Sequence, residues 1–141
     1  MTSQHAPVLF ATLLIATSAL AQSLEGKWLG QASPQAGAAC WTNERRSDGT
    51  YEVNFLAVTP SGNKRHREEG TWFSSNGLYA TVTHRINGED ADPANRRLRE
   101  IYRVIELNDS RFVYADLGSE TRFIVTRVPN DFSLTNSCPS E

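Results

Sequence analysis

From residue 23 onward, β-branched and aromatic residues alternate with polar ones, and turn-forming residues interrupt the alternation about every ten positions. Period-two alternation with regular turn signals is typical of an all-β sandwich or barrel. No window shows an apolar repeat of 3.6 residues, so we expect almost no helix. The pattern predicts about eight strands, at residues 24–32, 39–46, 50–58, 66–75, 78–86, 98–107, 111–117 and 121–128.

Three turns predict how neighbouring strands pair. Ser47-Asp48-Gly49 suits a three-residue hairpin loop, Asn76-Gly77 a two-residue primed turn, and Gly118-Ser119 a two-residue turn with glycine first. These turns predict the following cross-strand partners: Arg45 with Tyr51, Asn43 with Val53, Trp41 with Phe55, Trp72 with Thr81, Glu69 with His84, Tyr114 with Phe123, and Phe112 with Val125.

The connections between most of these strands are short, which makes an antiparallel meander. With an even number of strands, the last can pair with the first, and closure removes the exposed sheet edges. A two-sheet sandwich is the alternative, in which segments 33–38 and 87–97 would serve as crossovers. We favour an all-β, about eight-stranded antiparallel up-and-down barrel, with the charged segment 87–97 as a mobile loop.

The N-terminal segment has the layout of a secretory signal peptide. Residues 8–20 form the longest uncharged apolar run, and Ala19-Leu20-Ala21 closes it with small residues, which predicts cleavage after Ala21. The apolar core is shorter than the ~20 residues that a membrane-spanning helix needs. We therefore expect a periplasmic or secreted protein with a signal peptide over 1–21, a barrel over 22–128 and a C-terminal tail over 129–141.

Charge and cysteine content narrow the function classes further. The chain of 141 residues has 14 basic and 16 acidic residues, whereas a nucleic-acid-binding protein normally has a clear basic excess. In an oxidising compartment Cys40 and Cys138 are expected to form a disulfide that ties the tail back. Two unconnected buried thiols are the alternative.

A short motif suggests a family. Near the start of the mature chain is Leu24-Glu25-Gly26-Lys27-Trp28, and Arg127 lies near the end of the last predicted strand. A Gly-x-Trp in the first strand of a secreted meander of this size resembles the lipocalin and wider calycin families. The resemblance implies that Trp28 plugs one end of the barrel, that Arg127 packs across it and that Gly26 leaves room for the plug.

The resemblance is to an outlying member of these families. The Thr-Asp-Tyr motif of the central lipocalins is missing, and no helix follows the last strand. What the resemblance implies about function is non-covalent binding of a small, apolar or amphiphilic molecule inside the barrel.

The predicted registers point one set of side chains into the lumen. We interpret six of them as candidate ligand-binding residues: Tyr51, Tyr79, Tyr102, Tyr114, Arg45 and Arg127. Gly26, Trp28 and Trp72 are predicted to be structural. On strand 78–86 the inward face is predicted to be Tyr79, Thr81, Thr83 and Arg85. A small barrel can also be filled by its own side chains, so an open and a filled lumen remain alternatives.

Other chemistry has little support in the sequence. His66, Glu68, Glu69 and His84 share one hairpin, but the flanking Arg65 and Arg67 favour a solvated ion pair over a zinc site. We expect no metal, no cofactor and no enzyme, because no nucleophile elbow, phosphate loop or triad stands out. The alternative function is a periplasmic protein-binding module, such as an inhibitor or immunity-type partner, with a filled barrel and a docking surface at 87–99. A purely structural envelope protein is the third.

Overall fold

A computed structural model of the chain describes residues 23–32 and 38–139, and the predicted signal peptide lies outside them. The strands are β1 (Gly26–Gln31), β2 (Ala38–Arg45), β3 (Thr50–Thr59), β4 (Gly62–Ser75), β5 (Leu78–Ile86), β6 (Glu89–Asp90), β7 (Arg99–Leu107), β8 (Arg111–Asp116) and β9 (Arg122–Val128). A short 3-10 helix, η2 (Arg96–Leu98), precedes β7. No helix in this part of the chain has the length and hydrophobicity to cross a membrane.

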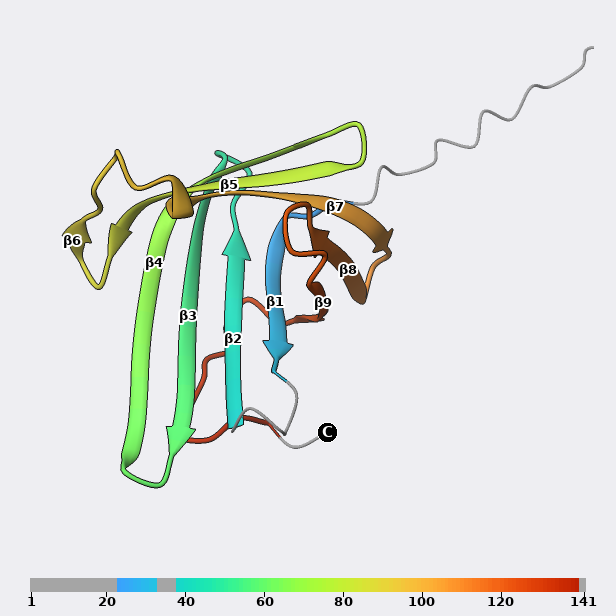
Figure 1. The fold of residues 1–141 in the computed structure, drawn as a ribbon. Coiled ribbons are helices and arrows are strands. Elements are labelled where there is room, and N and C mark those ends of the chain that lie inside the picture. Colours follow the sequence, from blue (N-terminus) through green and yellow to red (C-terminus); the bar gives the residue numbers. More distant parts are fainter. Residues whose placement is uncertain (1–22, 33–37, 140–141) are drawn as a thin grey trace, which may run out of the picture.

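Eight of the strands close into one antiparallel barrel (Figure 1). Around the sheet the order is β4-β3-β2-β1-β9-β8-β7-β5, and β4 pairs with β5 to complete the ring. The first and last strands are joined at Trp28 and Arg127, which lie opposite each other on β1 and β9. The predicted up-and-down barrel is confirmed, and the two-sheet sandwich is wrong. The connection from β5 to β7, predicted as a loop, contains the two-residue strand β6 and η2.

Most predicted strand partners are confirmed, and one is wrong. Glu69 pairs with Arg85 and not with His84, because the register shifts between Glu69 and Gly70 and leaves His84 as an extra residue on β5. A bulge of this kind turns the following side chain to the other face. Arg85 is therefore exposed on the outside of the barrel, which corrects its predicted inward position. The confirmed partners are Arg45 with Tyr51, Asn43 with Val53, Trp41 with Phe55, Trp72 with Thr81, Tyr114 with Phe123, and Phe112 with Val125.

Two of the three predicted turns have the expected backbone. Asn76 and Gly77 both have positive φ angles, 52° and 75°, as a primed two-residue turn requires. In the β8–β9 connection the residue with positive φ is Glu120, at 58°, so the predicted glycine-first turn is wrong. The Asp116 carboxylate organises this connection instead, accepting hydrogen bonds from the backbone N–H groups of Gly118 and Ser119 at 2.9 and 2.6 Å.

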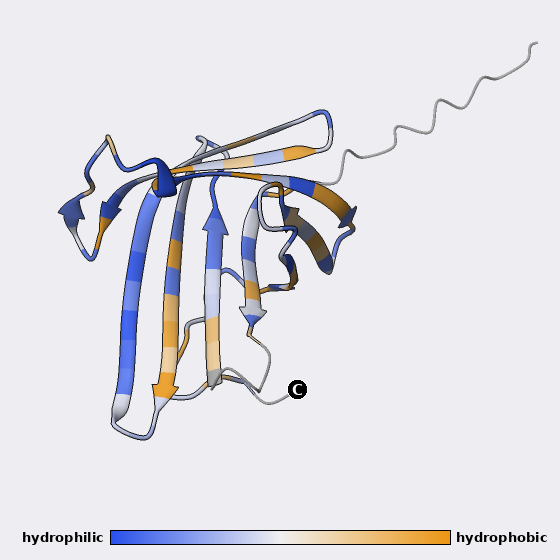
Figure 2. Cartoon of the chain, viewed as in Figure 1, coloured by the Kyte–Doolittle hydropathy of each residue, from blue (hydrophilic) through white to orange (hydrophobic). Residues whose placement is uncertain are grey.

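The core occupies the end of the barrel where β1 begins. Trp28 is fully buried there, and Phe112 and Val125 pack beside it. Hydropathy differs between neighbouring strands: β4 is hydrophilic along nearly its whole length, whereas the C-terminal end of β3 is hydrophobic (Figure 2).

Residues 129–139, here called the C-terminal strap, cross the outside of β1 to β4. Cys138 forms a disulfide with Cys40 on β2, with Cα atoms 5.7 Å apart, so the predicted disulfide is confirmed. Side chains of β1 and β4 also hold backbone carbonyl groups of the strap. Lys27 Nζ donates to Asn130 and Phe132, at 2.7 and 3.0 Å, and further donors are Gln31, Asn63 and Arg65.

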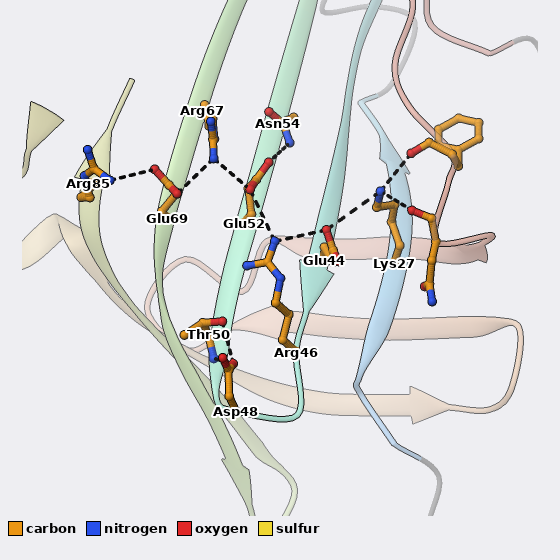
Figure 3. Close-up of polar contacts among 12 residues, drawn as sticks. Lys27, Glu44, Arg46, Asp48, Thr50, Glu52, Asn54, Arg67, Glu69 and Arg85 are labelled. Atoms are coloured by element: carbon orange, nitrogen blue, oxygen red, sulfur yellow. Dashed lines mark hydrogen bonds and ion pairs between the residues drawn. The ribbon is translucent and has the colours of Figure 1, made fainter. Parts of the chain in front are cut away.

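A chain of ion pairs runs across the outer face from β5 to β1 (Figure 3). Three glutamates lie side by side on neighbouring strands, a like-charge arrangement that is unfavourable by itself: Glu44, Glu52 and Glu69. Arg46 and Arg67 lie between them, with nitrogen–oxygen distances of 3.0 to 3.5 Å. Partial burial works to raise the pKa of Glu52, but hydrogen bonding by Asn54 and the two guanidinium groups outweigh it and leave that pKa lowered. The arginines therefore make the glutamate row compatible with the sheet.

Candidate functional site

The barrel interior is filled at one end and hollow at the other. The hollow part is a cavity of about 260 Å³. The cavity ends at Trp28 and the residues that pack around it. The filled lumen therefore describes the end of the barrel at Trp28, and the open lumen describes the other end. The cavity is lined by Trp41, Asn43, Tyr51, Val53, Phe55, Glu68, Tyr79, Thr81, Glu100, Tyr102, Tyr114 and Phe123.

Aromatic rings make up most of the cavity wall. Tyr79 stacks on Tyr102 with ring centroids 5.4 Å apart, and Tyr102 meets Tyr114 edge to face at 5.0 Å. Tyr114 then stacks on Phe123 at 5.1 Å, and Phe123 meets Trp41 at 6.3 Å. Offset-stacked and edge-to-face contacts are the favourable arrangements of aromatic pairs. The wall is therefore a connected set of rings whose positions depend on one another.

Gly30 on β1 makes room for this wall. It lies directly opposite Trp41 on β2. A Cβ atom at position 30 would overlap the indole ring of Trp41, so only glycine lets the ring lie flat against the strand. Sequence reasoning missed this residue. The signal that could have found it is the second glycine of Gly26-Lys27-Trp28-Leu29-Gly30, which is on the same face as the first.

All four predicted tyrosines line the cavity, and burial raises the pKa of three of them. Desolvation raises the pKa of Tyr51 to about 12, partly offset by its hydroxyl contact with Thr83 at 2.6 Å. Desolvation also raises the pKa of Tyr102 and of Tyr114. These hydroxyl groups stay protonated near neutral pH and act as hydrogen-bonding groups on an otherwise apolar surface.

Two buried polar side chains near the inner end of the cavity have unused hydrogen-bonding capacity. Asn43 lines the cavity and is 7% exposed, and its Oδ1 has no partner among the described residues. Arg45, which is 1% exposed, donates from Nε to the Tyr79 hydroxyl at 3.0 Å and packs over the Tyr79 ring at 4.5 Å. Its other two nitrogens also have no partner in this part of the chain. Unpaired polar groups of this kind are costly to bury.

Arg45 itself does not line the cavity. It was predicted to bind ligand, but the structure places its guanidinium group against Tyr79 and Phe112.

Two carboxylates lie on the cavity wall, and sequence reasoning did not select either of them. Glu68 on β4 hydrogen-bonds His66 at 2.7 Å and Thr83 at 3.4 Å. Glu100 on β7 lies opposite Thr81. Partial desolvation, followed by the negative charges of Glu68 and Asp116, raises the pKa of Glu100 above its usual value. The period-two alternation through Tyr102 places Glu100 on the inner face, and this was the available signal.

The filled end of the barrel, here called the closed end, has the contacts around Trp28 that the family resemblance implies. The Trp28 indole donates to the Leu24 carbonyl at 3.0 Å, and the Arg127 guanidinium lies 4.2 Å from the indole centroid. Arg127 also donates to the carbonyls of Ser23, Glu25 and Asp109. It is not among the residues that line the cavity, so the structure does not bring it to the other predicted ligand-binding residues.

The other two predicted structural residues also contact the closed end. A Cβ atom on Gly26 would meet the Arg127 guanidinium, and its φ of +102° disfavours any other residue. Trp72 is half-buried against the core and donates to the Arg46 carbonyl at 3.2 Å.

The remaining candidates are spread out. His84 contacts Thr71, at 3.0 Å, and Glu69 belongs to the outer ion-pair chain, so the predicted pair between them is wrong. Among residues 23–32 and 38–139, no group of three or more His, Cys, Asp or Glu residues could hold a metal ion. In segment 87–99, Arg96, Arg97 and Arg99 are exposed in or beside η2.

Comparison with known proteins adds no relative. The sequence matches no protein-family model and has no significant match among curated proteins. The closed eight-stranded antiparallel barrel is consistent with a calycin-like fold.

Proposed function

We propose that this chain is an exported lipocalin-like protein that binds or carries a small amphiphilic molecule in its barrel, without catalysis. The observation that carries the proposal is the cavity of about 260 Å³ with its aromatic wall and buried, unsatisfied Asn43. Ligand sites typically combine a mostly apolar surface with a few placed polar groups.

The size and chemistry of the cavity define the ligand class. At ~30 Å³ for each water molecule, the volume corresponds to roughly nine waters, which suits a compact ligand and not a long lipid. Rings would contact its apolar part, while Asn43 and the tyrosine hydroxyls would orient its polar part. The plug formed by Trp28 and Arg127 supports the lipocalin-like interpretation, and the Cys40–Cys138 disulfide fits an oxidising compartment.

Native mass spectrometry of the chain, expressed with its own N-terminal segment and recovered from the periplasm, tests the proposal. We expect the cleaved polypeptide to carry additional small-molecule mass that disappears on denaturation. Titration with an environment-sensitive hydrophobic fluorophore should show one saturable site per chain.

A matched pair of variants places that site. Thr81 lines the cavity, while its neighbour Val82 is on the opposite face of β5. Thr81→Phe should fill the cavity and abolish fluorophore binding, whereas Val82→Phe should leave it intact, with circular dichroism confirming that both variants fold. Bare polypeptide mass together with no saturable site would refute the proposal.

A further inference from the structure

The charged side chains on the cavity wall all have the same sign. Glu68 and Glu100 contribute carboxylates, and no Lys or Arg of the described residues lines the cavity. Both lie over the inner face of β5: Glu68 Oε2 lies 3.4 Å from the Thr83 hydroxyl, and Glu100 lies directly opposite Thr81. Thr81 and Thr83 are two positions apart on one strand, so their side chains point the same way. The carboxylates are therefore neighbours.

The described part of the chain places no Lys or Arg beside this pair inside the cavity. The raised pKa of Glu100 reflects partial desolvation together with the like charge of Glu68. On the outer face, by contrast, each glutamate of the ion-pair chain has an arginine or lysine within 4.0 Å. Within residues 23–32 and 38–139, the one basic side chain that pairs with an inner carboxylate is His66, which hydrogen-bonds Glu68.

A third acceptor points the same way. Asn43 Oδ1 lines the cavity, lies in a side chain that is 7% exposed and accepts no hydrogen bond from the described residues. A buried acceptor of this kind is satisfied by a ligand that brings a donor. The faces of the surrounding aromatic rings also carry partial negative charge and attract cations.

Arg45 does not reverse this balance. Its guanidinium packs on Tyr79 and Phe112, outside the cavity lining, and its single positive charge is smaller than the charge of the two carboxylates. An anion in the cavity would share it with the carboxylates of Glu68 and Glu100. A cleft lined by one sign of charge concentrates the opposite ion.

We infer that the cavity selects an organic cation, a protonated amine or a related N–H donor on a short apolar or aromatic stem, held by Glu68, Glu100 and the ring faces. This inference rests on the proposed luminal binding and names its ligand class.

Calorimetric titration of the full chain with three probes of similar size and different charge tests the inference. The probes are 2-phenylethylammonium, 3-phenylpropanol and 3-phenylpropionate. The ammonium should bind at least about tenfold more tightly than either of the others, since it alone can pair with the carboxylates. Raising the salt concentration should weaken the binding of the ammonium more than the binding of the alcohol.

Matched variants connect the preference to the residues. Glu68→Gln and Glu100→Gln should each weaken ammonium binding severalfold while sparing the alcohol, and the double variant should remove the preference. Glu69→Gln is the control, because Glu69 adjoins Glu68 in sequence but belongs to the outer ion-pair chain. Its affinity for the ammonium should equal that of the unmodified protein.

The outcomes separate this inference from the proposed function. Equal binding of all three probes, or an unchanged preference in the double variant, overturns the cation selectivity and leaves luminal binding standing. Tighter binding of the propionate that is lost in Arg45→Met overturns it in favour of an anion. Absence of binding by any probe, combined with no saturable fluorophore site, overturns both.

Discussion

Removing the disulfide should cost much stability and leave the barrel closed. In the variant Cys40→Ala/Cys138→Ala, the link between two residues 98 positions apart is lost. In the chain-entropy account a closed loop of this length contributes about 4.7 kcal/mol at 25 °C, because the link restricts the unfolded chain. The barrel itself is completed by the pairing of β1 with β9, which the strap does not provide.

We expect the free energy of unfolding to fall by about 3–5 kcal/mol in urea titrations followed by circular dichroism and tryptophan fluorescence. The dependence on urea should steepen, since the unlinked chain exposes more surface when unfolded. Unmodified protein treated with a reductant is the control. The reduced protein retains both sulfur atoms, so the stability that it loses comes from the cross-link alone and not from changed packing at buried Cys40.

Two results would contradict this reasoning. A loss below about 1 kcal/mol would mean that the link barely restricts the unfolded chain. Loss of the β-sheet circular dichroism spectrum in the variant without urea would mean that the barrel depends on the strap for closure.

Three further predictions concern the barrel interior. Gly30→Ala should lower the free energy of unfolding, measured in urea, by about 1–3 kcal/mol, because the new methyl group displaces the Trp41 ring. The fluorescence emission of Trp41 should shift as well. Unchanged stability would contradict the packing of Gly30 against Trp41. Glu100→Gln should raise the free energy of unfolding near neutral pH, because ionised Glu100 is disfavoured in the folded state. In urea titrations this gain in stability should shrink as the pH falls through the raised pKa of Glu100 and vanish below the ordinary value of 4.5. A gain that does not depend on pH would point to another cause. Stability should also fall above about pH 10, because the unfolded chain releases tyrosine protons there that the folded chain retains. Ultraviolet absorbance of the folded protein at about pH 11 should find at least three of the four tyrosines protonated: Tyr51, Tyr102 and Tyr114. Ordinary titration of these three near pH 10 would contradict their burial.

Local sequence signals predicted the registers well where a turn fixed them. Asn76-Gly77 placed Trp72 opposite Thr81, and Ser47-Asp48-Gly49 placed Arg45 opposite Tyr51. Once a turn sets the register, period-two alternation assigns every side chain to one of two faces. For this reason the four tyrosines were predicted to point inward, and the structure has them lining one cavity.

The prediction was wrong where one residue interrupted that alternation. The bulge beside Gly70 moves Arg85 to the outer face and separates Glu69 from His84. The structure shows a reason for its position: a Cβ atom at Gly70 would overlap the Val82 carbonyl and the Tyr51 ring. Those neighbours come from other strands, so the local sequence does not reveal the constraint.

The candidate site was predicted only in part, because knowing the face does not give the depth along the barrel. Arg45, Arg127 and Glu100 all belong to strands whose inner faces were assigned, yet Arg45 lies behind the cavity lining, Arg127 crosses the plug, and Glu100 lines the wall. Depth depends on how the tilted strands are staggered around the ring.

By itself, the sequence determined the eight strands of the barrel, their closed order, the inward tyrosines and the pairing of Cys40 with Cys138. These follow from alternation, turn chemistry and cysteine count, which are local or countable properties. Only the tertiary structure decided that one end of the lumen is filled and the other hollow, and that Glu68 and Glu100 line the same cavity as an unsatisfied Asn43. Such neighbours come from different strands, and their distances arise only when the sheet closes on itself.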